Sequence, residues 1–187
     1  MSDEVDAGHK VEAEAEVVLA LGANLGDREA TLRLALDELD ATDGVALQAV
    51  SPLVETDPVG GPDQPDYLNL VAVLTTSLAP ADLLAACHRI EQLHGRERDV
   101  RWGARTLDLD VIAYGRTGSS SEVVSTGPEL TLPHPRAHER AFVLAPWSQV
   151  QPDARLRLPT GEVRPVRELL AVAADRDGVR LPGTSAT

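Results

Sequence analysis

The sequence predicts an α+β fold in which helices pack on an antiparallel sheet. Short aliphatic and β-branched runs, typical of strands, alternate with longer segments whose apolar residues recur three or four positions apart, typical of helices. Clusters of glycine, proline and aspartate separate these segments. Their order is strand, helix, strand, strand, helix, strand, which is that of a ferredoxin-like βαββαβ core. A further hairpin and helix are expected C-terminal to this core.

The first half of the predicted core begins with a central strand over residues 17–21 and a helix over about residues 28–41. Asp27 precedes this helix and is a candidate for its N-cap. The intervening turn, GANLG, lacks a dinucleotide-binding fingerprint, so we interpret it as a tight strand-to-helix connection. A second strand is predicted over residues 45–56.

Residues 57–66 form a connection with three prolines and two glycines, a composition incompatible with a helix or a central strand. Either a plain connection or a lid would have this composition. A third strand follows over residues 67–76, with Tyr67 and Asn69 on one face. An aromatic ring beside an amide suits a flat heterocycle, and a strand end facing solvent would show the same pair.

The second half of the predicted core is a helix over about residues 77–94 and a fourth strand over residues 107–114. Cys87 belongs to the apolar stripe of the helix, so we expect it in the core and not as a nucleophile. A polar hairpin or loop is predicted over residues 116–129. The remaining elements are a hairpin over residues 155–164 and a helix over residues 166–174.

Length and composition indicate one domain over residues 17–175. The chain has 187 residues, of which 43% are hydrophobic, and it lacks the apolar run of about 18 residues that a membrane span needs. Its net charge of −13 argues against nucleic acid as a partner. We expect a disordered acidic leader over residues 1–16 and a flexible tail over residues 176–187. A single cysteine and an N-terminus unlike a signal peptide favour a cytoplasmic protein, which we expect to be a monomer.

The segment over residues 95–115, GRERDVRWGARTLDLDVIAYG, has four arginines within ten residues and then a strand with Asp108 and Asp110. Residues two apart in a strand share a face, so these carboxylates would lie about 7 Å apart, with Leu109 and Val111 buried on the other face. The carboxylates repel each other unless cations bind between them, and Mg²⁺ with phosphate oxygens suits them. Arginine forks also suit phosphate oxygens. The segment therefore predicts phosphoryl or nucleotidyl transfer.

Ordinary surface salt bridges between the aspartates and nearby arginines would use the same residue types. Lys10 is the only lysine, so a Walker-A loop is excluded and phosphate binding would depend on arginine and metal. Farther along, Arg140 adds positive charge and Phe142 offers a second aromatic wall. His134 and His138 are four residues apart, but the prolines that flank His134 argue against a regular helix and hence against a zinc site.

Three blocks of the sequence, in order, resemble the 6-hydroxymethyl-7,8-dihydropterin pyrophosphokinase family. The blocks are LGANLGDR, then TDPVG through DQPDYLN, then GRERDVRWGARTLDLDVIAYG with LPHPRAHERAFVLAP. The resemblance covers roughly residues 17–159. It implies an enzyme of folate biosynthesis that transfers pyrophosphate from ATP to the hydroxymethyl group of the dihydropterin and releases AMP.

The resemblance also implies roles for individual residues. Asp108 and Asp110 would hold two Mg²⁺ ions that bridge the ATP phosphates, while Arg96 and Arg98 would be catalytic residues on a loop that closes over the triphosphate. The implied pterin-binding residues are Thr56, Pro58, Val59, Tyr67, Asn69, Trp102 and Phe142. The implied ATP-binding residues are Glu91, Arg98, Arg105, His134 and Arg140. No strong base is evident, so positioning and charge neutralisation would supply most of the rate.

Two other functions stay open on the sequence. One is a different Mg²⁺-dependent phosphotransferase or nucleotidyltransferase, which would bind nucleotide without pterin. The other is a ferredoxin-like regulatory or ligand-binding module without catalysis. Metal-binding, phosphate-binding and aromatic residues occur together in this chain, which favours the pyrophosphokinase.

Overall fold

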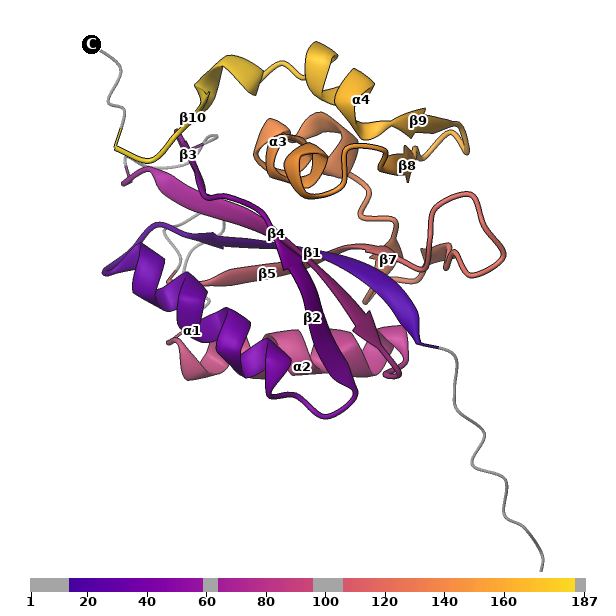
Figure 1. Cartoon of the computed structure of the whole chain (residues 1–187), viewed down its shortest axis with the longest axis horizontal. Coiled ribbons are helices and arrows are strands. Elements are labelled where there is room, and N and C mark those ends of the chain that lie inside the picture. The colour runs from indigo at the N-terminus through magenta and orange to yellow at the C-terminus, as the bar shows by residue number, and fades with distance from the viewer. Residues whose placement is uncertain (1–13, 59–63, 96–105, 184–187) are drawn as a thin grey trace, which may run out of the picture.

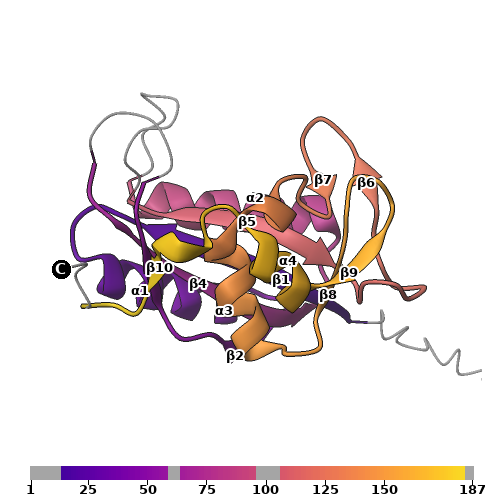
Figure 2. The same ribbon diagram turned by 90° about the horizontal axis from the view of Figure 1, so that it is seen from above.

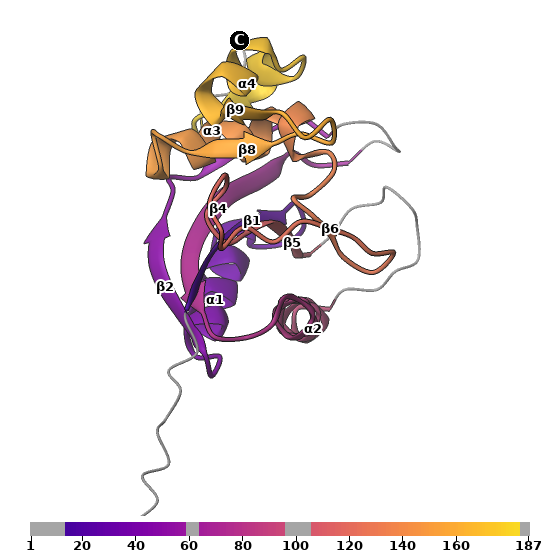
Figure 3. The same ribbon diagram turned by 90° about the vertical axis from the view of Figure 1, so that its right-hand side faces the viewer.

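A central antiparallel sheet separates two layers of helices (Figure 1). The computed structural model describes residues 14–58, 64–95 and 106–183. The strands of the sheet are β1 (Ala15–Ala23), β2 (Val45–Val50), β3 (Val54–Thr56), β4 (Tyr67–Thr76), β5 (Asp108–Tyr114) and β10 (Val179–Arg180). Helices α1 (Arg28–Asp40) and α2 (Pro80–Leu93) cover one face, while α3 (Ala141–Val150) and α4 (Val166–Val172) lie on the other side, as Figure 3 shows from the edge.

Strand β1 lies in the middle of the sheet and pairs antiparallel with both β4 and β5. The other edge of β4 pairs with β2 along one half of its length and with β3 along the other half. Helix α1 connects β1 to β2, and α2 connects β4 to β5. The predicted α+β fold with a βαββαβ core is therefore confirmed.

The two faces of the sheet contribute to separate cores. Large leucines of β1 and β4, including Leu19, Leu21 and Leu74, pack toward α1 and α2. On the other face, Val71 and Ile112 belong to a core that also contains residues of α3 and α4. Strand β1 is buried on both faces because it is central, which explains its continuous apolar run.

Several local predictions agree with this structure. The side chain of Asp27 caps α1, because its Oδ1 accepts a hydrogen bond from the backbone N–H of Ala30 at 3.0 Å. Cys87 is fully buried on α2, as expected of a core residue. Burial, reinforced by the nearby Glu91 and Asp110, raises the pKa of its thiol to about 12, so the thiol stays protonated at neutral pH.

The predicted strand over residues 45–56 is a pair of strands in the structure, β2 and β3. Pro52 lies between them and has no amide hydrogen to donate to a ladder. Ser51 bridges the interruption: its backbone N–H donates to the Val71 carbonyl, and its hydroxyl accepts from the Val71 N–H, both at 2.9 Å. The break turns the chain so that β2 and β3 can each pair with a different half of β4.

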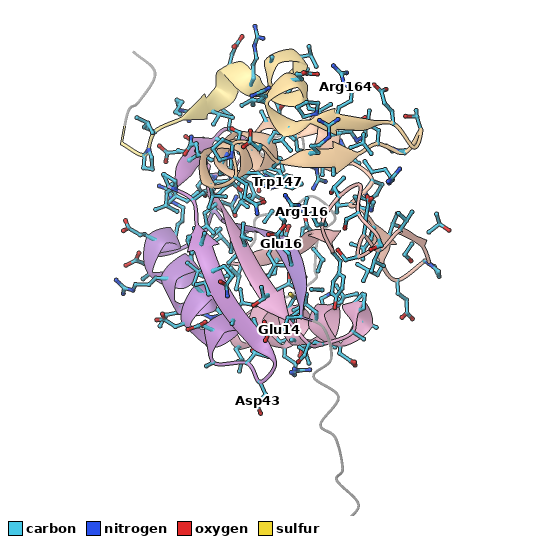
Figure 4. The ribbon with its side chains drawn as sticks, turned by 45° about the vertical axis from the view of Figure 1, so that its right-hand side comes forward. Glu14, Glu16, Asp43, Arg116, Trp147 and Arg164 are labelled. Carbon is cyan, nitrogen blue, oxygen red and sulfur yellow. The ribbon has the colours of Figure 1, made fainter. Side chains whose placement is uncertain are left out.

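Helix α3 was not among the sequence-based expectations. Pro146 lies inside it, and an internal proline removes a helical hydrogen bond. The helix is nevertheless buried, since Val143, Leu144 and Trp147 are at most 2% exposed. Trp147 projects from α3 toward the sheet in Figure 4, and its indole N–H donates to Gln151 Oε1 at 2.9 Å. Tertiary burial therefore outweighs the local cost of the proline.

Both predicted ends of the ordered region need correction. Strand β1 begins at Ala15, which pairs with Thr76, although residues 1–16 were expected to form the leader. The expected flexible tail over residues 176–187 includes a 3₁₀ helix, Arg176–Gly178, and strand β10, which lies beside β3 (Figure 1). Strand β10 is too short to show a period in the sequence, and it is held by pairing with a distant strand.

Two hairpins lie beside the sheet (Figure 2). Strands β6 (Ser125–Thr126) and β7 (Thr131–Leu132) form the first, and β8 (Arg155–Arg157) and β9 (Val163–Pro165) form the predicted second. Arg157 donates to both carboxylate oxygens of Glu122, at 2.9 and 2.7 Å, and this bond lowers the pKa of Glu122. The second hairpin is thereby joined to the polar loop that precedes the first. Within the described ranges, no helix is long and apolar enough to cross a membrane.

Candidate active site

The two aspartates of the predicted metal site lie on the exposed face of one end of β5. Asp108 and Asp110 are half-buried, while Leu109 and Val111 between and beside them are 3% exposed and belong to the core under α1 and α2. This alternation confirms the predicted division of faces. Among the residues that the structure describes, no group of three or more His, Cys, Asp or Glu side chains could hold a metal. Two half-buried carboxylates on one face instead fit Mg²⁺, which takes one or two carboxylates and completes its shell with waters and substrate phosphates.

A row of residues across the sheet joins the predicted metal and pterin residues. Gly22 of β1 is the cross-strand partner of Asn69 on β4 and also of Asp108 on β5. Directly opposite residues share a face, so the three lie side by side on the face away from α1 and α2. Asn69 and Asp108 are therefore two strand spacings apart, about 10 Å. They are 39 positions apart in sequence, and only the strand register brings them together.

Gly22 leaves room in this row for the amide of Asn69. A Cβ at position 22 would lie 2.8 Å from Asn69 Oδ1, so the Asn69 amide would have to shift to admit it. The Asn69 Nδ2 donates to the hydroxyl of Thr56 at 2.9 Å, and both residues are buried. The amide is thus fixed in orientation before any ligand arrives, which is what recognition of a heterocycle edge requires.

Two aromatic residues that were predicted to bind pterin lie on different elements. Tyr67 pairs with Thr56 and, being two positions from Asn69, points to the same face of β4. Phe142 is partly buried near the start of α3, the helix that packs on β4 and β3. Pro58 is half-buried just after β3. The sheet and α3 therefore supply one aromatic residue each.

Arg140 connects this aromatic region to the aspartates. Its Nη1 lies 3.4 Å from Asp110 Oδ2, and its guanidinium lies 5.5 Å from the centre of the Phe142 ring. The first contact is long for an ion pair, and the second is a cation–π distance. Arg140 is thus one of the neighbouring arginines that the salt-bridge interpretation required, and its fork lies beside the carboxylate and the ring.

His134 is held on the same side by a bulge in β5. The pairing of β1 and β5 shifts between Val18 and Leu19, which leaves Ile112 without a partner on β1. The carbonyl of Ile112 accepts from the backbone N–H of His134 at 2.8 Å. The Arg136 backbone N–H donates to His134 Nδ1 at 3.2 Å, which leaves Nε2 to carry the proton of the neutral ring.

The environment of His134 keeps this ring neutral. Burial lowers the pKa of His134 to about 4, and the positive charge of Arg140 acts in the same direction, against the opposite effect of Asp108. A neutral imidazole with Nε2–H is a hydrogen-bond donor without a charge. It can therefore donate to a phosphate oxygen at neutral pH.

Glu91 supports β5 from the opposite face. This carboxylate on α2 is 1% exposed, and its Oε1 accepts from the backbone N–H of Leu109 at 2.9 Å. Leu109 lies between the two aspartates in sequence, so this hydrogen bond fixes the position of that part of β5 relative to α2. The observed contact of Glu91 therefore positions β5. The predicted contact between Glu91 and ATP stays a prediction.

Two residues that were not singled out in the sequence hold the segment leading into Tyr67. Asn24 is 1% exposed, and its Nδ2 donates to Gln64 Oε1 and to the Pro65 carbonyl, both at 3.1 Å. Arg28 donates to the Asp66 carbonyl at 2.7 Å and to Glu55 Oε1 at 3.0 Å. Both belong to the LGANLGDR block, so that block ties the strand-to-helix turn to the β3–β4 connection.

The remaining predicted site residues lie outside the part of the chain that the structure describes. They are Val59, Arg96, Arg98, Trp102 and Arg105. Their predicted roles stay predictions.

Comparisons with known proteins point to one protein family. A family model described as 7,8-dihydro-6-hydroxymethylpterin-pyrophosphokinase matches residues 18–152. A Pseudomonas aeruginosa protein named 2-amino-4-hydroxy-6-hydroxymethyldihydropteridine pyrophosphokinase is 46% identical over 167 residues, covering 89% of this chain and 97% of that protein. Proteins of the same name from Mycobacterium tuberculosis strain H37Rv and Bacillus subtilis are 47% and 39% identical, covering 88% and 87% of each chain.

Solved structures share the fold at low sequence identity. The wild-type HPPK-DHPS of Plasmodium falciparum matches with a TM-score of 0.61 and 13% identity over 87% of this chain and 45% of that one. The same protein with pterin and p-hydroxybenzoate gives a TM-score of 0.63 at 14% identity. This chain spans less than half of those longer chains, and the likeness concerns the fold alone.

Proposed function

Because this chain belongs to the 7,8-dihydro-6-hydroxymethylpterin-pyrophosphokinase family, we propose that ATP and Mg²⁺ bind at Asp108 and Asp110 beside a pterin at Asn69. The reaction of the family is transfer of pyrophosphate to 6-hydroxymethyl-7,8-dihydropterin, a step of folate biosynthesis. The observation that carries the proposal is the row Asn69–Gly22–Asp108. It places a fixed amide about 10 Å from a carboxylate, a distance that a hydroxymethyl pterin and the phosphates of ATP would fill together.

The phosphate half of the site consists of donors around two acids. Mg²⁺ held by Asp108 and Asp110 would neutralise the charge that develops on the phosphate oxygens. Arg140 exchanges its long contact with Asp110 for phosphate oxygens, to which a planar fork binds well. His134 donates its Nε2–H to the same group, and Arg96, Arg98 and Arg105 of the adjoining segment add charge.

The pterin half of the site consists of a fixed amide between aromatic rings. Asn69 offers amide hydrogen-bonding groups to the edge of the heterocycle, held in place by Thr56. Tyr67 from the sheet and Phe142 from α3 stack on the two faces of the pterin ring, and Trp102 covers the ring. The backbone from Thr56 to Val59, including Pro58, contacts its edge.

The two halves set up an in-line displacement. The hydroxymethyl oxygen attacks the β-phosphorus of ATP, the bond from that phosphorus to the bridging oxygen of the α-phosphate breaks, and AMP leaves. The hydroxyl proton passes to solvent as the new ester bond forms. Positioning and charge neutralisation supply most of the rate, because no strong base is evident among the site residues that the structure describes.

The test is nucleotide release from ATP and Mg²⁺ with and without 6-hydroxymethyl-7,8-dihydropterin. AMP that forms only with the pterin would support the donor, the acceptor and pyrophosphoryl transfer together. ADP in place of AMP would retain the metal site and reject pyrophosphoryl transfer. No nucleotide product under either condition would favour a binding module instead. The monomeric state and the cytoplasmic location stay predictions from the sequence.

A further inference from the structure

The C-terminal strand holds both ends of the connection between β3 and β4 through one arginine. Arg180 Nη1 donates to Asp57 Oδ1 and its Nη2 donates to Asp66 Oδ2, each at 2.8 Å. Asp57 directly follows β3, and Asp66 directly precedes β4. The Arg180 side chain is 17% exposed, while the side chains of Asp57 and Asp66 are 64% and 40% exposed, so the guanidinium is the enclosed member of both charge-assisted bonds.

The backbone of the same strand runs beside the pterin residues. Val179 is the cross-strand partner of Thr56, and Thr56 in turn is the partner of Tyr67. Because Thr56 also accepts the hydrogen bond from Asn69, a displacement of β3 would be transmitted to the amide. Thr56, Asn69 and Tyr67 of β3 and β4 form one wall of the proposed pterin site. Strand β10 therefore supports this wall from its outer edge.

The other wall of the proposed site is the start of α3, which carries Phe142. A second residue of the C-terminal segment, Asp175, fixes this wall. Both carboxylate oxygens of Asp175 accept from the backbone N–H of Ala141, at 3.0 and 3.1 Å. Ala141 is the first residue of α3, and the residue at the N-cap position, Arg140, makes no side-chain cap of its own. Asp175 thus acts as a cap supplied from 34 positions away and fixes the turn that carries Phe142.

We propose that the segment from Asp175 to Arg180 is a positioning element that sets the distance between the two walls of the pterin site. The inference rests on the proposed pterin site. Five residue steps separate the two anchors, which limits their separation to about 18 Å, and the intervening 3₁₀ helix shortens it further. One short chain segment therefore joins the Tyr67 side, where β10 pairs with β3, to the Phe142 side at the start of α3.

Steady-state kinetics of Arg180→Ala and Asp175→Ala test this. We expect the KM for the pterin to rise about tenfold in each, which corresponds to the loss of a charge-assisted hydrogen bond, with the KM for ATP changed less than about twofold. Arg180→Lys keeps the charge and can reach one carboxylate, so it should restore part of the affinity. Asp177→Ala, in the same segment and paired with exposed Arg176, is the matched control and should behave as the wild type.

A structural measurement separates this proposal from the proposed function. Backbone amide chemical shifts in the free protein should change at Thr56 and Tyr67 in Arg180→Ala, and at Phe142 in Asp175→Ala. Such shifts would support positioning even if the wild type produced no pterin-dependent AMP, a result that would reject only the proposed function. Unchanged shifts, or losses that affect ATP and pterin equally and follow the melting temperature, would overturn it.

Discussion

The two faces of the central sheet have different compositions and different tasks. The face under α1 and α2 is lined by leucines that are almost fully buried, among them Leu19, Leu21 and Leu74. The face under α3 has smaller side chains, such as Ala20 and Val71, and then a polar row at one end that includes Asn69 and Asp108. Alternation along each strand keeps the two compositions apart.

This difference shows how a small domain combines stability with an open site. One face is covered along its length and supplies hydrophobic stabilisation, roughly 1.5 to 3 kcal/mol for each fully buried large side chain. The other face is covered where α3 packs and leaves half-buried carboxylates beyond it. Changes on the two faces should therefore separate loss of stability from loss of turnover.

The largest effect on turnover is expected for Asp110→Ala on the open face. Turnover should fall by at least about 100-fold, the usual cost of removing one group that stabilises transition-state charge. The urea midpoint should change little, since the substitution relieves repulsion from Asp108 and the contact that Asp110 makes with Arg140 is long, at 3.4 Å. Asp43→Ala, in the exposed turn after α1 (Figure 4), is the control with unchanged kinetics. Wild-type turnover in Asp110→Ala would remove Asp110 from the metal site.

Leu21→Ala makes the opposite test on the closed face. Leu21 is 1% exposed, and truncation of such a leucine costs about 2 to 5 kcal/mol because a cavity remains. Urea denaturation should show this loss, while the KM values of the folded protein stay within about twofold of wild type. A large rise in the pterin KM at unchanged stability would contradict the separation of the faces.

Gly22→Ala, at the next residue, points to the other face and should reverse this outcome. The added Cβ would meet Asn69 Oδ1 at 2.8 Å and push the amide away from Thr56. We expect the pterin KM to rise about tenfold, consistent with a disturbed buried hydrogen bond, and the KM for ATP to change less. Isothermal titration with the pterin would measure the same loss directly. Equal losses for both substrates would indicate a general distortion of β1.

The smallest effect concerns pH. His134 has a pKa of about 4 in the folded protein and about 6.5 when unfolded, so between these values the unfolded chain binds the proton first. The contribution of His134 to stability is fully present above pH 6.5 and is lost as the pH falls toward 4. A histidine resonance that titrates near 4 in the wild type and disappears in His134→Gln would establish the shift. Titration near 6.5 would contradict the buried, neutral ring.

The local sequence was sufficient for most of the secondary structure. The helical period of α1 and its Asp27 cap, and the alternation of β5, depend on neighbouring residues and were predicted correctly. Helix α3 was missed because Pro146 opposes it locally, while burial of Trp147 against the sheet favours it. Strand β10 was missed because its stability comes from a partner more than a hundred positions away.

The sequence by itself therefore determined the α+β class, the order of the core elements and the aspartate pair, since periods and spacings are local properties. Only the tertiary structure decided the register that places Gly22 between Asn69 and Asp108. It alone also brought Asp175 to α3 and Arg180 to Asp57 and Asp66. Such contacts depend on how distant strands and helices pack. Periodicity in the sequence relates only neighbouring residues, so it does not predict them.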